Sequence, residues 1–175
     1  DLMPDRPFKR NGKPHARPTN GQVFQDAQAA QRALEAKLGP VAACWSYHDA
    51  NGSLVGRVLR WNLPDGSKTI RPLAKHLDGW RIGAMPEPRP LYCLPEVLRA
   101  GAETPIVICE GEKATDAARR CGLVATTSAG GSQAAGKTDW TPLRGRRVVL
   151  LPDNDEPGEH YAETVARLKG MNLQF

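Results

Sequence analysis

The sequence predicts an α/β fold: a mainly parallel sheet flanked by helices, preceded by a small β-rich (α+β) N-terminal subdomain. Two observations predict it. From Pro105 onward, short continuous apolar runs alternate with helical segments, which is typical of buried parallel strands joined by helices. Before residue 100, β-rich runs are separated by Asn51-Gly52 and Asp65-Gly66, dipeptides that tight hairpin turns favour. We therefore expect a basic, proline-rich arm over residues 1–20, a helix and β-meander subdomain over 21–100, and the α/β domain over 101–175.

The composition is that of a globular protein. The chain has 175 residues, of which 40% are hydrophobic, and this is enough for a buried core. No apolar run approaches the length of a membrane span, and the first residues lack the apolar stretch of a signal peptide. We therefore expect a cytoplasmic location and no membrane partner. The four cysteines form no C-x-x-C pair, which indicates reduced thiols rather than zinc ligands or disulfides. The net charge of +5 is compatible with a polyanionic partner without identifying one.

The N-terminal subdomain is predicted to open with one amphipathic helix. Apolar residues recur at helical spacing from Val23 to Leu38, Asn20 is suited to be the N-cap, and Gly39-Pro40 ends the pattern. A three-stranded antiparallel meander then follows, and a proline-rich connection over residues 85–95 leads out of it.

Aromatic and basic side chains are mixed along the predicted meander. Such mixtures can stack nucleic-acid bases and bind phosphates. The candidates for phosphate or nucleic-acid binding are Arg57, Arg60 and Arg71. The alternative is that the aromatic residues fill a small core while the arginines face solvent.

In the α/β domain, strands and helices are expected to alternate. The predicted segments are, in order, PIVICEGE (strand), KATDAARRCG (helix), LVATTSAGG (strand), a glycine-rich loop with a short helix around DWTPL, RRVVLLPDND (strand) and PGEHYAETVARLKG (helix). The closing MNLQF begins one more strand. Because this leaves the sheet incomplete, we expect the chain to be a piece of a larger protein.

Three acidic residues follow the ends of two predicted parallel strands. Glu110 comes directly after one strand, and Asp153 and Asp155 come after another. Because the carboxyl ends of parallel strands meet at one edge of a sheet, we expect the three carboxylates to converge there. Crowded carboxylates need a hard cation, and Mg²⁺ suits a site made of a few carboxylates and substrate phosphates. Gly111 and Gly158 leave room for the backbone beside the acids.

The stretch VICEGEKATDAARRCG, followed by VVLLPDNDEPG, resembles the TOPRIM domain, the metal-binding fold shared by DNA primases, topoisomerases, recombination proteins and some nucleases. The shared pattern is an apolar strand ending in Glu-Gly and a later apolar strand ending in Asp-x-Asp with a glycine three residues on. The motifs are most similar to those of primases and primase-helicases of phages and plasmids. The resemblance implies that Glu110 is the catalytic acid and that Asp153 and Asp155 are metal ligands.

The same resemblance implies the activity of a DNA primase catalytic fragment. Such a fragment makes RNA primers on a single-stranded DNA template from NTPs, by nucleotidyl transfer that depends on Mg²⁺ (or Mn²⁺), and works with a helicase domain or a replicative helicase. Two alternatives stay open, a TOPRIM-type nuclease and a nucleic-acid-binding recombination module. A topoisomerase is disfavoured because the chain has no room for a domain with a nucleophilic tyrosine.

Basic and glycine residues near the acids are further candidates. Lys113, at the start of the helix after Glu110, is a candidate catalytic and phosphate-binding residue, with a solvated surface lysine as the alternative. Gly130, Gly131 and Lys137 belong to a glycine-rich loop that we expect to border the metal site and to contact phosphates.

This loop also contains GSQAAGKT, which fits the P-loop pattern of NTPases. A P-loop leads into a long helix, whereas here Pro142 and Gly145 end the segment within two turns. The P-loop is therefore the weakest of the alternatives.

Overall fold

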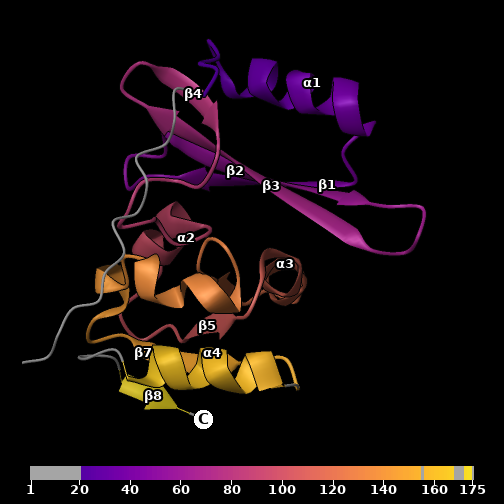
Figure 1. Cartoon of the computed structure of the whole chain (residues 1–175). Helices are drawn as coiled ribbons and strands as arrows, with labels where there is room; N and C mark the ends of the chain where they lie inside the picture. Colours follow the sequence, from indigo (N-terminus) through magenta and orange to yellow (C-terminus); the bar gives the residue numbers. More distant parts are fainter. Residues whose placement is uncertain (1–20, 155, 168–171, 175) are drawn as a thin grey trace, which may run out of the picture.

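The computed structural model describes residues 21–154, 156–167 and 172–174. These residues form two packed parts, an N-terminal subdomain built on an antiparallel sheet and an α/β part built on a parallel sheet (Figure 1). The predicted basic arm over residues 1–20 lies outside the described residues. Within the described ranges, we find no helix with the length and apolar character that a membrane span requires.

The N-terminal subdomain begins with helix α1, Ala27–Leu38. The predicted start at Asn20 is wrong, because the chain is still extended at Phe24. There Phe24 and Trp80 each donate a backbone hydrogen bond of 2.8 Å to the other's carbonyl oxygen. The N-cap is Asp26, whose carboxylate accepts a hydrogen bond of 2.7 Å from a backbone N–H of the first turn. This bond satisfies one of the N–H groups that a helix leaves unpaired at its start.

Four antiparallel strands follow in chain order. They are β1 Ala43–His48, β2 Leu54–Asn62, β3 Lys68–His76 and β4 Gly79–Ile82. The two predicted hairpin turns are present, with Gly52 and Gly66 at φ 83° and 81°, in the left-handed region that glycine adopts without strain. The prediction of three strands missed β4, which is only four residues long and is separated from β3 by Leu77 and Asp78 alone.

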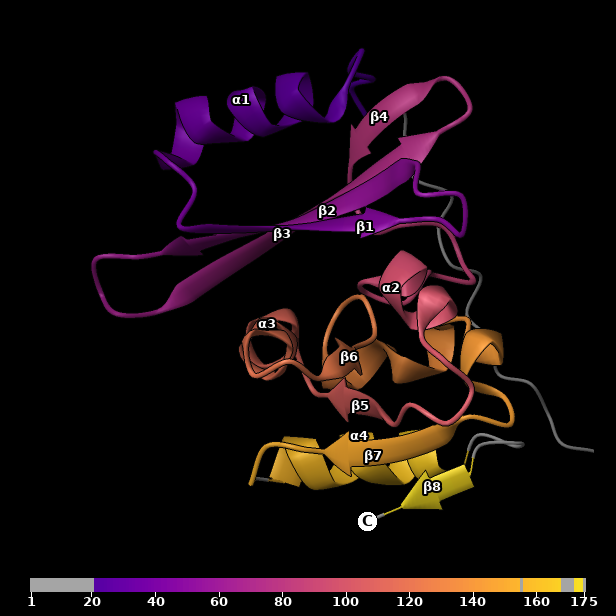
Figure 2. The same ribbon diagram turned by 180° about the vertical axis from the view of Figure 1, so that it is seen from behind.

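Both faces of this sheet are covered. On one face Leu59 and Trp61 pack with Leu34 of α1. On the other face Tyr47 and Val58 pack with residues that precede or belong to the α/β part. The views in Figures 1 and 2 show α1 over one side of the sheet and the α/β part beneath the other. The aromatic residues of the meander are thus largely core residues.

The α/β part contains a parallel sheet in the order β6-β5-β7-β8 (Figure 2). Its strands are β5 Ile106–Cys109, β6 Val124–Thr126, β7 Arg147–Leu151 and β8 Asn172–Gln174. All four residues of the central strand β5 are buried, as expected of a strand covered on both faces. The last strand confirms the prediction that MNLQF contributes to the sheet.

Helices cover the two faces of the parallel sheet. They are α2 Leu94–Arg99, α3 Glu112–Arg120 and α4 Glu156–Ala166. The side chains of β5 alternate between them: Val107 and Cys109 pack against α3, whereas Ile106 and Ile108 pack against α2 and α4. The predicted α/β architecture is therefore confirmed. The glycine-rich loop after β6 contains two 3₁₀ helices, η1 Ser132–Lys137 and η2 Thr141–Leu143.

Candidate active site

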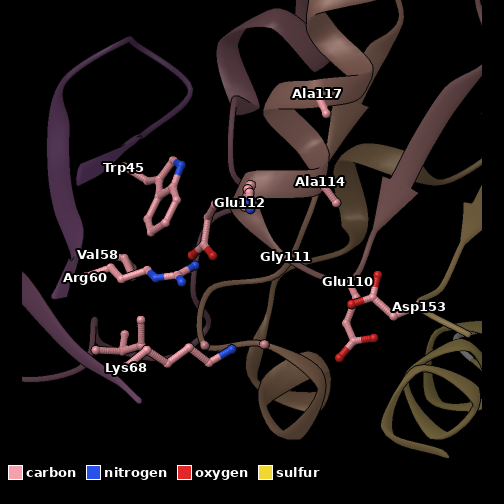
Figure 3. Close-up of a pocket in the computed structure, with 14 residues that line it drawn as sticks. Trp45, Val58, Arg60, Lys68, Glu110, Gly111, Glu112, Ala114, Ala117 and Asp153 are labelled. Atoms are coloured by element: carbon pink, nitrogen blue, oxygen red, sulfur yellow. The ribbon is translucent and has the colours of Figure 1, made fainter. Parts of the chain in front are cut away.

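A cleft of about 610 Å³ lies between the two parts of the chain. One wall is the face of the antiparallel sheet that carries Trp45, Val58 and Arg60, and the other is formed by the ends of β5 and β7 with the first turn of α3 (Figure 3). This volume is in the range of pockets that bind small molecules and cofactors. The cleft is the place where residues from both halves of the sequence meet.

Glu110 and Asp153 lie side by side at one end of the cleft (Figure 3). The sheet explains why. Strands β5 and β7 are parallel neighbours in which Cys109 is paired with Leu151, so the residues that follow the two strands leave the sheet at the same edge. The predicted convergence of these two acids is confirmed, whereas the third predicted ligand, Asp155, lies outside the described residues.

The chemistry of these donors suits a hard cation. Two carboxylates offer oxygen ligands, and Mg²⁺ in enzymes is commonly held by one or two carboxylates together with substrate phosphates and water. Among the described residues no group of three or more acidic, histidine or cysteine side chains forms a ready metal cage. Glu110 and Asp153 therefore fit Mg²⁺ as part of a site that substrate or a further ligand completes.

Gly158 brings helix α4 close to the acidic end. A Cβ atom built on Gly158 would lie 2.1 Å from the carbonyl oxygen of Asp153. No real side chain tolerates such a distance, so only glycine allows the first turn of α4 to approach the backbone of Asp153. The sequence predicted that Gly158 gives the backbone room, although it lies within α4 rather than before it.

Glu112, in the first turn of α3, projects into the cleft beside the antiparallel sheet (Figure 3). Its Oε1 accepts a hydrogen bond of 2.8 Å from the hydroxyl group of Tyr47. Burial raises the pKa of the Glu112 carboxyl, and its backbone hydrogen bond and the bond from Tyr47 oppose that rise. The pKa of Tyr47 is also raised, first by burial and then by the neighbouring Glu112.

A second set of hydrogen bonds holds the same strand and helix together. Asp116 accepts from the indole N–H of Trp45 at 2.9 Å and from the hydroxyl group of Tyr92 at 3.0 Å. The sequence predicted only a surface ion pair between Asp116 and Arg119, which is present at 3.4 Å. The missed signal was a matched spacing: Trp45 and Tyr47 share one face of β1, and Asp116 and Glu112 lie one helical turn apart.

The basic residues of the antiparallel sheet divide between its two faces. Arg60 and Lys68 line the cleft. Arg57 lies on the other face, where its guanidinium group donates to the amide oxygen of Gln31 of α1 at 2.9 Å. Arg71 is paired with Leu59 across the strands, so it shares that face as well. Of the three predicted arginines the structure thus brings only Arg60 to the cleft, and the sequence missed Lys68.

Lys113, Gly130 and Gly131 line the cleft, as expected from their places after β5 and β6. Lys137 is not among the residues that line it, and its Nζ lies 3.5 Å from a carboxylate oxygen of Glu87. The GSQAAGKT segment forms a 3₁₀ helix of six residues instead of the long α-helix that a P-loop needs. The structure therefore argues against the P-loop alternative.

The fold is that of a phage-type primase fragment. No family model and no curated protein matches the sequence. Among solved structures, the chain is similar to the primase fragment of the bacteriophage T7 primase-helicase protein, with a TM-score of 0.50 and 18% identity over 75% of this chain and 52% of that one. The chain thus spans about half the length of that fragment.

A second similar structure comes from a bacteriophage T7 replication complex. It is a chain of the lagging-strand DNA polymerase interacting with primase domains of two gp4 subunits bound to an RNA/DNA hybrid and dTTP. The TM-score is 0.51 and the identity 18%, over 89% of this chain and 81% of that one. At this identity the likeness shows the fold, and it agrees with the TOPRIM-type primase fold expected from the two acidic motifs.

Proposed function

We propose that this chain is the catalytic part of a DNA primase. It carries out metal-dependent nucleotidyl transfer and makes RNA primers from NTPs on a single-stranded DNA template. The observation that supports this most directly is the arrangement of the cleft: Glu110 and Asp153 occupy one end, and the basic side chains of Arg60 and Lys68 line the facing wall. A nucleoside triphosphate needs both, because its phosphates are anionic and its transfer requires a metal.

Each charged residue of the cleft has a role in this proposal. Glu110, Asp153 and Asp155 hold Mg²⁺ (or Mn²⁺), with Glu110 as the catalytic acid of the set. When bound, the cation stabilises the charge that develops on the triphosphate during in-line displacement. Lys68 from one wall and Lys113 from the other hold the phosphates. A helicase domain or replicative helicase is the expected partner of such a primase.

The test is ribonucleotide incorporation on single-stranded DNA by the 175-residue chain with Mg²⁺ or Mn²⁺, run beside a nuclease assay on the same DNA. Glu110→Gln should abolish incorporation while the exposed Glu159→Gln on α4 retains it, since both substitutions remove one negative charge but only one lies in the cleft. Metal-dependent cleavage of the DNA without incorporation would instead indicate a nuclease. DNA binding without either reaction would indicate a recombination module.

A further inference from the structure

The end of the cleft away from Glu110 and Asp153 has a chemistry of its own. Trp45, Val58 and Ile70 form an apolar wall, which suits a flat ring. In Figure 3 the carboxylate of Glu112 and the guanidinium group of Arg60 extend toward one another beside Trp45. Phosphate binding and metal binding account for neither the apolar wall nor an acid placed beside a base.

Glu112 and Arg60 both keep hydrogen-bonding capacity for a ligand. An ionised carboxylate has about four acceptor positions, and the hydroxyl group of Tyr47 uses one of those of Glu112. The Nε of Arg60 donates to Asn62 at 3.1 Å, which leaves its terminal nitrogens for other acceptors. Within the part of the chain that the structure describes, no ion pair involves either side chain.

A carboxylate beside a guanidinium group is complementary to guanine. Guanine presents two neighbouring donors, N1–H and the N2 amino group, and next to them two acceptors, O6 and N7. A carboxylate accepts from the first pair, and arginine donates to the second pair in the commonest base-specific contact of proteins. Adenine reverses this order, with an acceptor at N1 and a donor at N6, so it would face Glu112 and Arg60 with the wrong groups.

We propose that this end of the cleft binds a guanine base, which lies against the apolar wall at Trp45 while Glu112 and Arg60 act as specificity-determining residues. The inference rests on the proposed nucleotidyl transfer and names the base that the site prefers. A ribose bound by its hydroxyl groups would explain Glu112 alone and would leave Arg60 and the apolar wall without a role. The guanine belongs either to free GTP or to a DNA strand, and both sources share the same ring.

The test compares affinities for GTP, ITP, ATP and dGTP by titration calorimetry on the 175-residue chain with Mg²⁺. The parent should bind GTP and dGTP alike and about tenfold more tightly than ATP, the discrimination expected of a bidentate base contact. ITP, which lacks the N2 amino group, should lie between them. Glu112→Gln and Arg60→Met should each bring the GTP and ATP affinities together, whereas Glu159→Gln, with the same change in charge outside the cleft, should keep the parent's preference.

Two further arms make the result decisive. Octamers of thymidylate with one central dG or dA separate the sources, since a preference seen only with the strand assigns the base to the template and still supports the guanine site. Thermal melting checks the fold, and Arg60→Met decides the question if Glu112→Gln unfolds through loss of the Tyr47 contact.

The contradicting outcomes are distinct. Nucleotide binding without base preference, or a preference that survives both substitutions, overturns the guanine site and leaves the proposed function standing. Discrimination of GTP from dGTP but not from ATP places Glu112 on the ribose and also overturns it. Absence of any nucleotide or strand binding overturns the inference and the proposed function together.

Discussion

Glu110 and Asp153 carry like charges at the ends of adjacent strands, and a cation between them relieves their repulsion. A metal that binds the folded chain and not the unfolded one must therefore raise the stability of the fold by mass action. The size of that rise measures the metal affinity of the site without any need for enzymatic activity.

We predict that Mn²⁺ raises the melting temperature of the parent relative to EDTA by about 5–10 °C when the metal is at 100 times its Kd. Asp153→Asn should lose most of this rise, and Asp155→Asn, at the third predicted ligand, should behave in the same way. In EDTA both variants should be as stable as the parent or more so, because each removes one repelling charge. Glu159→Gln is the control, and equal metal shifts in all four proteins would contradict a metal site at these acids.

The sequence predicts some residues of the cleft and not others for a physical reason. Glu110 and Asp153 follow parallel strands, so their meeting depends only on strand direction and adjacency. The position of Lys68 depends on the register between β2 and β3, and that of Glu112 on how β1 packs against α3. Register and packing between distant segments leave no local pattern in the chain.

At the scale of elements, long periodic segments were predicted correctly and short ones were missed. The central strands and α3 follow from continuous apolar runs and glycine stops. Helix α2 is only six residues long and begins beside Pro95, in a stretch whose prolines indicate a loop. Proline is nevertheless well tolerated in the first turn of a helix, where its missing N–H is not needed. The start of α1 moved because a backbone pairing with β4 competed with the helical pattern.

Helix α4 depends on a single glycine for its position. We predict that Gly158→Ala destabilises the fold by about 1–3 kcal/mol in urea unfolding, because the new methyl group would meet the backbone of Asp153 at a distance that forces a shift. The metal-induced rise in melting temperature should fall as well, since Asp153 is the residue that must move. Gly136→Ala is the matched control, because a Cβ atom there has no neighbour within 4 Å. Equal losses in the two variants would show that α4 does not constrain Asp153.

At the scale of the whole molecule, buried hydrogen bonds join the two parts of the chain. Tyr47 is fully buried, and its hydroxyl group reaches the carboxylate of Glu112 from the opposite side of the interface. A hydrogen bond to a charged partner contributes more to stability than one between neutral groups. The antiparallel sheet and the α/β part should therefore unfold as one unit.

We predict that Tyr47→Phe lowers the free energy of unfolding by about 1.5–3 kcal/mol, the range for a hydrogen bond to a charged group. Tyr161→Phe provides the matched control, because Tyr161 is equally buried but its hydroxyl group has only long contacts, of 3.4 and 3.5 Å, with Ser128 and Thr127. Its loss should be below about 1 kcal/mol. Urea unfolding followed by tryptophan fluorescence and by circular dichroism measures both, and similar losses in the two variants would show that the interface bond has no special weight.

The hydrogen bonds from Trp45 and Tyr47 to α3 also have a kinetic consequence. They tie the two walls of the cleft to one another at its inner side, so the distance between the walls is set when the chain folds. A nucleotide then meets a preorganised site and spends little of its binding free energy on bringing the walls together. Association should accordingly be limited by diffusion and orientation, without a slow closing step of the kind that hinged enzymes show.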